Sequence, residues 1–189
     1  PVPTCPPLPG SAALDAAAAL PPTATDQRGL PRVRDADGAG GAVADIGAVE
    51  SFFAQVDVAD DELDTPAGAN DVSIREALRD APAGAIITFA PGLSGQTMTL
   101  NETLGTFQPA RAVCLDASSL PGGFTLHRAG AAARLFLLAP GVSLHLQHLR
   151  LTGSTTVFTE SGGVVINFGG ALSLDGCSLT GHQVTGVGG

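Results

Sequence analysis

The sequence predicts an all-β fold: a parallel β-helix with a short capping helix at its N-terminal end, preceded by a loop-rich segment. From residue 85 onward, short apolar runs follow one another and are separated by Gly, Pro, Ser or Asn turns. One unit recurs almost as a copy, which indicates a repeat architecture. The copy also contains a break in the strand period that requires a corner. No amphipathic helices lie between the strands, so the pattern does not predict βαβ units.

The near-copy joins residues 144–153, LHLQHLRLTG, to residues 172–181, LSLDGCSLTG, with an offset of 28 residues. Apolar residues keep their places in the two segments, and both segments close on Thr-Gly. A second match, FAPGLS at residues 89–94 and LAPGVS at residues 138–143, has an offset of 49 residues, about two such units. Periods of this size are typical of proteins in which one coil stacks on the next.

The phase of the near-copy predicts where the chain turns. Leu144 and Leu146 alternate as one strand, but the next apolar pair begins at Leu149, three residues after Leu146. In a continuous strand, a side chain three positions further on points to the opposite face. Both pairs therefore face one core only if the chain turns near His148, and the same corner is expected at residues 175–176.

Three segments are expected along the chain. Residues 1–50 are rich in Pro, Ala and Gly, and little regular structure is expected there. Residues 51–82 contain a strand-like run, an acidic loop and a short helix. Residues 83–189 contain the coils, whose pattern stops within a unit, so we expect the chain to be a piece of a longer protein.

The capping helix is predicted over residues 73–81. Ser73 and Glu76 have the spacing of a capping box, and Pro82 with Gly84 ends the segment. Four apolar residues lie on one helical face: Ile74, Ala77, Leu78 and Ala81. A helix of this length is not stable alone in water. The open end of a β-helix exposes strand edges and core residues, so we expect the helix to cover that end.

The alternation within the strands predicts which residues face the core. They are Ile87, Phe89, Met98, Leu100, Val113, Leu115, Leu126, Leu137, Leu144, Leu146, Leu149, Leu151, Val165, Leu172, Leu174, Cys177 and Leu179. The cysteines Cys5, Cys114 and Cys177 lie far apart and match no zinc or redox spacing. At least one of the three is unpaired within this chain, and we expect Cys114 and Cys177 to be buried small hydrophobes inside strands.

Two groups of motifs resemble parts of large bacterial surface and secreted proteins. The run VSIREAL, from Val72, and the strand that follows it resemble the start of the CSLREA domain. Val72 stands where that motif has its cysteine, so any disulfide the family makes there is absent. The segments GVSLHLQHLRLTG and GGVVINFGGALSLDGCSLTG resemble coils of right-handed β-helix proteins of the polymorphic outer-membrane protein type.

The first segment resembles a different domain. Its motifs SAALDA, TDQRGLPR and ADIGAVE resemble three successive motifs of the choice-of-anchor Q domain, which closes such proteins near their C-terminus. The closing piece of one unit would then precede the opening piece of another, as in a tandem array. These resemblances imply a right-handed coil and a secreted or bacterial cell-surface or outer-membrane location. They imply no established activity.

Composition excludes several classes of partner. The net charge is −9, and all nine basic residues are arginine, which argues against a nucleic-acid-binding protein because such a protein needs a basic face. No run approaches the ~18 apolar residues of a membrane span, and no secretory signal precedes the chain's apolar segments. Between residues 57 and 80, eight acids accompany two arginines, a local charge of −6. Most of the acidity is therefore concentrated near one loop.

The charged residues around the helix have two interpretations. Arg75, Glu76 and Asp80 have the chemistry of an acid, a base and an anchor, but they also suit a structural cap, with Arg75 and Arg79 offsetting the acidic loop. We favour the cap. Clustered carboxylates in residues 57–71 suit calcium, although the spacing lacks the ligand order of a calcium loop, so a solvated loop is preferred and calcium is the alternative.

The remaining polar residues give no convergent site in the sequence. His145 and His148 would point to opposite faces of a strand, or lie across a corner, so solvent-facing side chains are expected rather than a metal site. His127 and His182 have no partner that the sequence identifies. In the first segment, four residues are expected to form salt bridges that order the chain: Asp26, Arg28, Arg32 and Asp45.

These observations predict a non-enzymatic scaffold, structural or adhesin-like, that contacts surface glycans or host or cell-surface proteins. The alternative is a carbohydrate-active enzyme, either a pectate-lyase-like polysaccharide lyase or a glycosidase, since β-helices also carry such activities. That chemistry needs paired carboxylates, or acids that bind calcium beside a basic residue. Between residues 83 and 181 the acids are Glu102, Asp116, Glu160 and Asp175, and the chain has no Lys, Trp or Tyr. We therefore predict no catalytic, cofactor or metal residues.

Overall fold

In the computed structural model of the protein, the described residues are 11–18, 24–27, 32, 43–48, 50, 53–63, 71–130, 134–153 and 163–183. The chain forms two compact units. Residues Pro1–Phe53 with Gly84–Ile86 form one unit, and Ala54–Ala83 with Ile87–Gly189 form the other. The second unit contains nearly all of the regular structure.

The described elements are short strands with one α-helix. In chain order they are β1 (Phe53–Val56), α1 (Ile74–Asp80), β2 (Ala85–Phe89), the 3-10 turn η1 (Pro91–Leu93), β3 (Thr97–Thr99), β4 (Val113–Asp116), β5 (Phe124–Arg128), β6 (Phe136–Leu138), β7 (Ser143–Gln147), β8 (Leu149–Gly153), β9 (Val165–Asn167), β10 (Ala171–Asp175) and β11 (Ser178–Thr180). This content confirms the all-β prediction.

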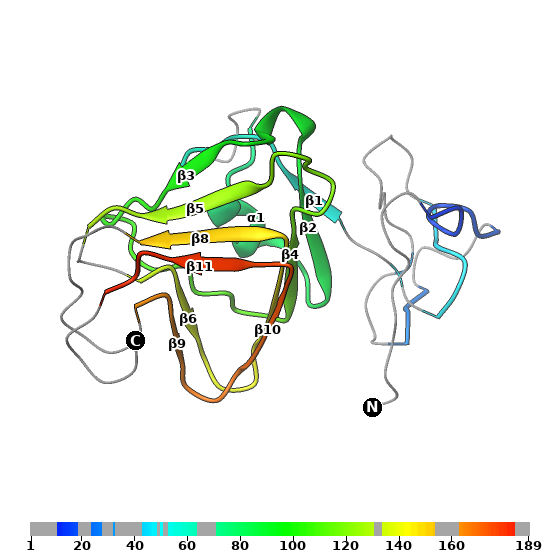
Figure 1. The fold of residues 1–189 in the computed structure, drawn as a ribbon. Coiled ribbons are helices and arrows are strands. Elements are labelled where there is room, and N and C mark those ends of the chain that lie inside the picture. The colour runs from blue at the N-terminus through cyan, green and yellow to red at the C-terminus, as the bar shows by residue number, and fades with distance from the viewer. Residues whose placement is uncertain are drawn as a thin grey trace. The chain divides into compact units, whose positions relative to one another are not determined.

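Three sheets share these strands. Their orders are β1-β2-β4-β7-β10, β11-β8-β5-β3 and β6-β9. The chain runs through one strand of each sheet and then returns one rung further on, as in β4-β5-β6 and β7-β8-β9, and Figure 1 shows β3, β5, β8 and β11 stacked in one layer. The pairs β4·β7, β7·β10 and β5·β8 are parallel. The protein is therefore a parallel β-helix, as the near-copy predicts.

The corner lies where the phase of the near-copy predicts it. His148 separates β7 from β8 and has a φ of 56°, and Gly176 separates β10 from β11 with a φ of 60°. Leu144 and Leu149 lie in different sheets, yet their exposed fractions are 1% and 0%. Both leucines therefore face one core, and the corner prediction is confirmed.

The corner gives a first testable prediction. A left-handed backbone costs a non-glycine residue about 1–2 kcal/mol, and glycine avoids this cost. We expect His148→Gly to be more stable than His148→Ala by about 1 kcal/mol, because both variants lose the ring but only alanine keeps the strain. Urea denaturation of the two variants measures the difference. Equal stabilities would show that the corner stores no strain at this position.

Register stacks the apolar residues into columns. One column runs through Leu115, Leu146 and Leu174, and another through Met98, Leu126, Leu151 and Leu179. The predicted inward residues that are buried are Ile87, Phe89, Met98, Leu100, Val113, Leu115, Leu126, Leu144, Leu146, Leu149 and Leu151. Phe124 and Phe136 add to this core, and Phe124 lies 4.8 Å from Phe89 between ring centroids.

The inward prediction is wrong for Leu137. In β6 the outer residues of the strand, Phe136 and Leu138, are buried, and Leu137 between them is only half-buried. Four apolar residues in a row carry no alternation, so their phase cannot be read from the sequence. Contact decides the phase: the ring centroid of Phe136 lies 5.5 Å from that of Phe107.

The last rung also differs from the prediction, for a different reason. Leu172, Leu174 and Leu179 are 36%, 42% and 45% exposed, although each is in register with a buried leucine of the preceding rung. A residue within a column is buried by the rungs on both sides, and no described rung covers these three. Val165 and Cys177 are half-buried.

The helix forms as its capping residues predict. Ser73 accepts a hydrogen bond from the backbone N–H of Glu76, and the Glu76 side chain accepts one from the N–H of Ser73, so both halves of the capping box are present. The four residues of the predicted apolar face are all buried: Ile74, Ala77, Leu78 and Ala81. The helix therefore lies with its apolar face against the protein, as a short helix must.

Candidate functional site

The charged cluster at the helix is built around one buried ion pair. Arg75 Nε donates to Asp61 Oδ1 at 2.7 Å and Arg75 Nη2 donates to Asp61 Oδ2 at 2.8 Å. The two side chains are 13% and 0% exposed. Asp61 Oδ2 also accepts from the backbone N–H of Asn101 at 2.7 Å. The aspartate thus joins the acidic loop to both the helix and the first coil.

Arg75 makes further contacts with the loop that follows β3. It donates to the carbonyl oxygens of Leu104 at 3.3 Å and Gly105 at 2.8 Å, and its guanidinium carbon lies 4.6 Å from the centroid of the Phe107 ring. A planar guanidinium with five N–H donors suits such a junction better than an ammonium group does. These contacts hold the helix against the first coil.

The three residues with acid, base and anchor chemistry do not converge on one point. Arg75 is bound to Asp61, Glu76 belongs to the capping box, and Asp80 pairs with Arg79 at 2.7 Å on the surface. The hydrogen bond from Arg79 holds the pKa of Asp80 below its usual value. Each group therefore has a structural partner, which agrees with the cap interpretation.

Two of the described acids of the loop, Asp57 and Asp61, bind backbone atoms. Asp57 Oδ1 accepts from the N–H of Val72 at 2.6 Å, and Asp61 binds as described above. Asp64 lies outside the described residues. Within the described part of the chain, the acids of this loop form no group of three with the spacing of metal ligands. Calcium in this loop therefore gains no geometric support from the residues that the structure describes.

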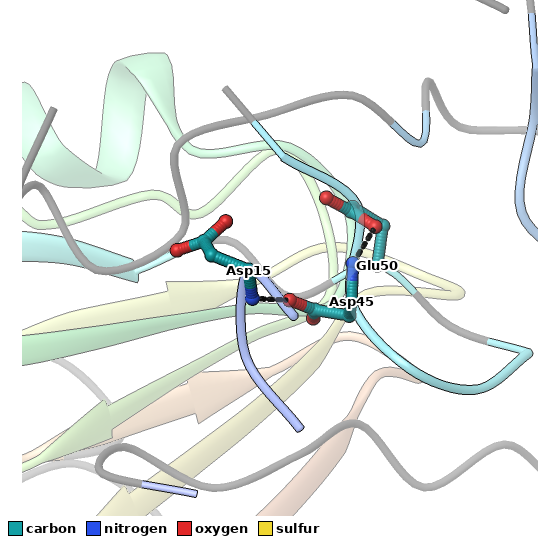
Figure 2. A group of neighbouring side chains, drawn as sticks. All are labelled: Asp15, Asp45 and Glu50. Carbon is teal, nitrogen blue, oxygen red and sulfur yellow. Dashed lines mark hydrogen bonds between the residues drawn. The ribbon is translucent and has the colours of Figure 1, made fainter. Parts of the chain in front are cut away.

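A group of carboxylates that the sequence did not reveal lies in the first unit. Asp15, Asp45 and Glu50 each offer an oxygen, and these atoms lie within 4.8 Å of one another (Figure 2). Asp45 is 0% and Glu50 2% exposed. Oxygen ligands at this spacing suit a hard cation such as calcium. Thirty residues separate the first two members, and this distance explains why sequence spacing did not find the group.

Main-chain contacts account for how these acids are held. Asp45 Oδ1 accepts from the N–H of Asp15 at 3.0 Å, and Glu50 Oε2 accepts from the N–H of Asp45 at 3.0 Å (Figure 2). Asp26 Oδ2 accepts from the N–H of Glu50 at 3.1 Å. Carboxylates that bind backbone donors order a chain that has little regular structure. We interpret the group as a means by which the described residues around Asp15, Asp45 and Glu50 keep their conformation.

Arg32 and Asp45 were expected to act through salt bridges. Arg32 Nη2 donates to the carbonyl oxygens of Asp45 at 2.8 Å and Gly47 at 2.5 Å, so the contacts described for this arginine are to the main chain. Arg28 lies outside the described residues. These hydrogen bonds contribute to the ordering that we expected, and the salt bridges stay a prediction.

On the outer face of the first sheet, the register aligns two acids. Asp116 on β4 and Asp175 on β10 both pair with Gln147 on β7, so they lie two strand spacings apart, about 9.6 Å. Asp116 Oδ1 accepts from the N–H of Ser118 at 2.8 Å, and Gln147 Nε2 lies 3.4 Å from His145 Nε2. This polar ladder was missed because it spans non-adjacent coils. Of the other two acids, Glu160 lies outside the described residues and Glu102 packs against Gly130.

The histidines have local partners. His127 Nδ1 lies 2.9 Å from Thr152 Oγ1, and His182 Nε2 lies 3.1 Å from the carbonyl oxygen of Leu151. Burial lowers the pKa of His182 below its usual value, against the opposing effect of the Leu151 carbonyl. His148 is exposed at the corner, as expected, whereas His145 is half-buried. Among the described residues no metal-binding group contains a histidine.

Cys114 and Cys177 are both unbonded and half-buried, rather than buried inside strands as expected. Cys114 lies on the outer face of β4, and Cys177 lies between β10 and β11, with its Sγ 3.3 Å from the carbonyl oxygen of Leu146. Burial, helped by the charge of Asp116, raises the pKa of Cys114 from 9.0 to about 12. Cys5 lies outside the described residues.

This shift gives a second prediction. At pH 8 iodoacetamide should alkylate Cys114 about a thousand-fold more slowly in the folded protein than in urea, because only the thiolate reacts and its fraction falls by about three orders of magnitude. The folded-state preference for the neutral thiol contributes to stability below pH 9 and is lost as the pH rises toward 12. Peptide mass spectrometry separates the three cysteines. Similar rates with and without urea would contradict the shift.

Comparison of the chain with protein-family models, with curated proteins and with solved structures gave no match. Among the described residues, no helix is long and apolar enough to cross a membrane. The functional proposal therefore rests on the sequence motifs and the geometry of the chain itself.

Proposed function

We propose that the protein is a non-enzymatic scaffold, secreted or displayed at a bacterial cell surface, in which a rigid β-helix presents its outer faces to surface glycans or cell-surface proteins. The observation that carries this proposal is the stack of parallel rungs in register. Each rung contacts only its neighbours, so the β-helix extends in one direction and repeats its outer faces from rung to rung.

The distribution of polar groups supports a structural role. In β7, Leu144 and Leu146 face the core, while the outward His145 and Gln147 are available to a partner. The charged groups that would be candidates for chemistry at the helix are bound to one another or to the backbone. A surface of this kind suits recognition through many weak polar contacts.

Sequence motifs, rather than the geometry, support the proposed location at a bacterial cell surface. The VSIREAL run resembles the CSLREA domain of bacterial surface and secreted proteins, and residues 11–50 resemble the choice-of-anchor Q domain. Both resemblances suggest that the protein is exported and displayed at the cell surface, where a β-helix scaffold contacts glycans and other cells.

One observation favours the second candidate, a carbohydrate-active enzyme. The backbone spacing of about 9.6 Å between Asp116 and Asp175 is just above the range of about 6.5–9.5 Å that separates the two carboxyl groups of inverting glycosidases. Against this, Gln147 lies between the two acids in the ladder, and Asp116 already accepts from Ser118. The general acid of a glycosidase lies in a sheltered, apolar environment, whereas Asp175 is exposed. We therefore rank the scaffold above the enzyme.

A glycan array, read with and without calcium, tests the proposal together with an assay for product formation on acidic and neutral polysaccharides. The scaffold predicts binding without product. The double variant Asp116→Asn and Asp175→Asn separates the two candidates, because an enzyme would lose its product and a scaffold has none to lose. Product formation by the unmodified chain that this variant abolishes would overturn the proposal.

A further inference from the structure

A cavity of about 410 Å³ lies between the capping helix and the loop that follows β3. Its lining comes from both elements: Leu78 and Arg79 from the helix, and Leu104, Phe107 and Gln108 from the loop. Binding pockets for small molecules have volumes of about 300–1,000 Å³, with mostly apolar walls and a few polar groups. The cavity meets that description, and the proposed scaffold function does not use it.

The walls of the cavity are apolar, and part of them is open to solvent. Leu78 and Phe107 are 6% and 1% exposed and form the buried part. Leu63 and Leu104, which also line the cavity, are 40% and 39% exposed. Covering exposed leucines beside a concave apolar surface removes apolar area from water, which lowers the free energy of the complex. The cavity therefore favours a ligand with an apolar body.

Two of the polar side chains that line the cavity, Arg75 and Arg79, carry only hydrogen-bond donors, whereas Thr106 and Gln108 can both donate and accept. Arg79 is bound to Asp80, but both side chains are exposed, 37% and 62%, and an exposed pair of this kind contributes little. Its guanidinium can therefore exchange Asp80 for another anion. Four hydrogen bonds are described for Arg75, which has five N–H donors. The cavity thus offers arginine N–H groups beside an apolar wall.

From this combination we propose that the cavity binds a small amphipathic carboxylate, with its apolar part against Leu63, Leu104 and Phe107 and its carboxylate on Arg79. The volume of about 410 Å³ holds about a dozen non-hydrogen atoms, at roughly 30 Å³ each. Arginine binds a carboxylate with two parallel hydrogen bonds, which gives the site its preference for an anion.

Octanoate and 1-octanol are suitable probes because they share an apolar chain and differ in the carboxylate. Titration of the isotope-labelled protein, followed by ¹H–¹⁵N correlation spectra, gives both affinity and location. We expect saturable shifts at the cavity residues and an affinity for octanoate about tenfold higher than for 1-octanol. Arg79→Gln should abolish this difference. Arg150→Gln, which removes an exposed arginine on β8, should preserve it.

A second variant tests the apolar part of the site. Ala110 lines the cavity and is exposed, so Ala110→Phe should narrow the cavity and weaken binding of both probes by about tenfold while the spectrum keeps its dispersion. Equal affinity for the two probes would overturn the carboxylate assignment. An absence of saturable shifts, or shifts concentrated at the exposed leucines of β10 and β11, would overturn the site itself.

Discussion

Replacing Asp61 with alanine is expected to lower the free energy of unfolding by about 3–5 kcal/mol, because it leaves a buried guanidinium without its counter-charge. Asp61 accepts from Arg75 through both carboxylate oxygens and also from the N–H of Asn101. The substitution therefore removes the ion pair and one link to the first coil together. Urea denaturation followed by circular dichroism measures the loss.

Asp60 provides the matched control. It is the preceding residue, it is exposed, and it carries the same charge, so Asp60→Ala should change stability by less than about 0.5 kcal/mol. Arg75→Lys keeps the charge but not the two parallel hydrogen bonds, and it should destabilise the protein as well. If Asp61→Ala and Asp60→Ala were equally stable, the ion pair would not hold the helix to the coil.

The sequence predicts the position of this cluster but not its connections. The Ser73 and Glu76 spacing is local, so the helix and its cap could be read directly. Arg75 was expected to offset the acidic loop, and the six acids of that loop were candidates. The choice of Asp61 depends on a loop folding back over fourteen residues and meeting Asn101 forty residues further on. Spacing carries no information on such contacts.

The same distinction between local and distant contacts explains the rest of the fold. The repeat predicted the corner at His148, because the same break in the strand period occurs in both copies. Leu137 was misassigned because its neighbours are also apolar, so the sequence shows no alternation. The contact between Phe107 and Phe136 determines which residues of β6 face the core. The carboxylate group of the first unit was missed for a related reason: its members are thirty or more residues apart, or five apart, in a segment whose sequence has no periodic pattern.

Leu146→Ala is expected to destabilise the protein far more than Leu174→Ala, although the two leucines occupy the same place in neighbouring rungs. Leu146 is 0% exposed and pairs in register with Leu115 on one side and Leu174 on the other. Truncating a fully buried leucine costs about 2–5 kcal/mol, because it removes apolar contact and leaves a cavity.

Leu174 is 42% exposed and has a described neighbour in its column on one side only. Its truncation should cost less than about 1 kcal/mol, since little buried surface is lost and the site opens to solvent. The near-copy makes this a controlled comparison, because the residue type and the position in the strand are the same in both rungs. Equal losses in urea denaturation would mean that the last rung is covered in solution. A loss at Leu146 alone would show that burial by the following rung, rather than the strand itself, stabilises each coil.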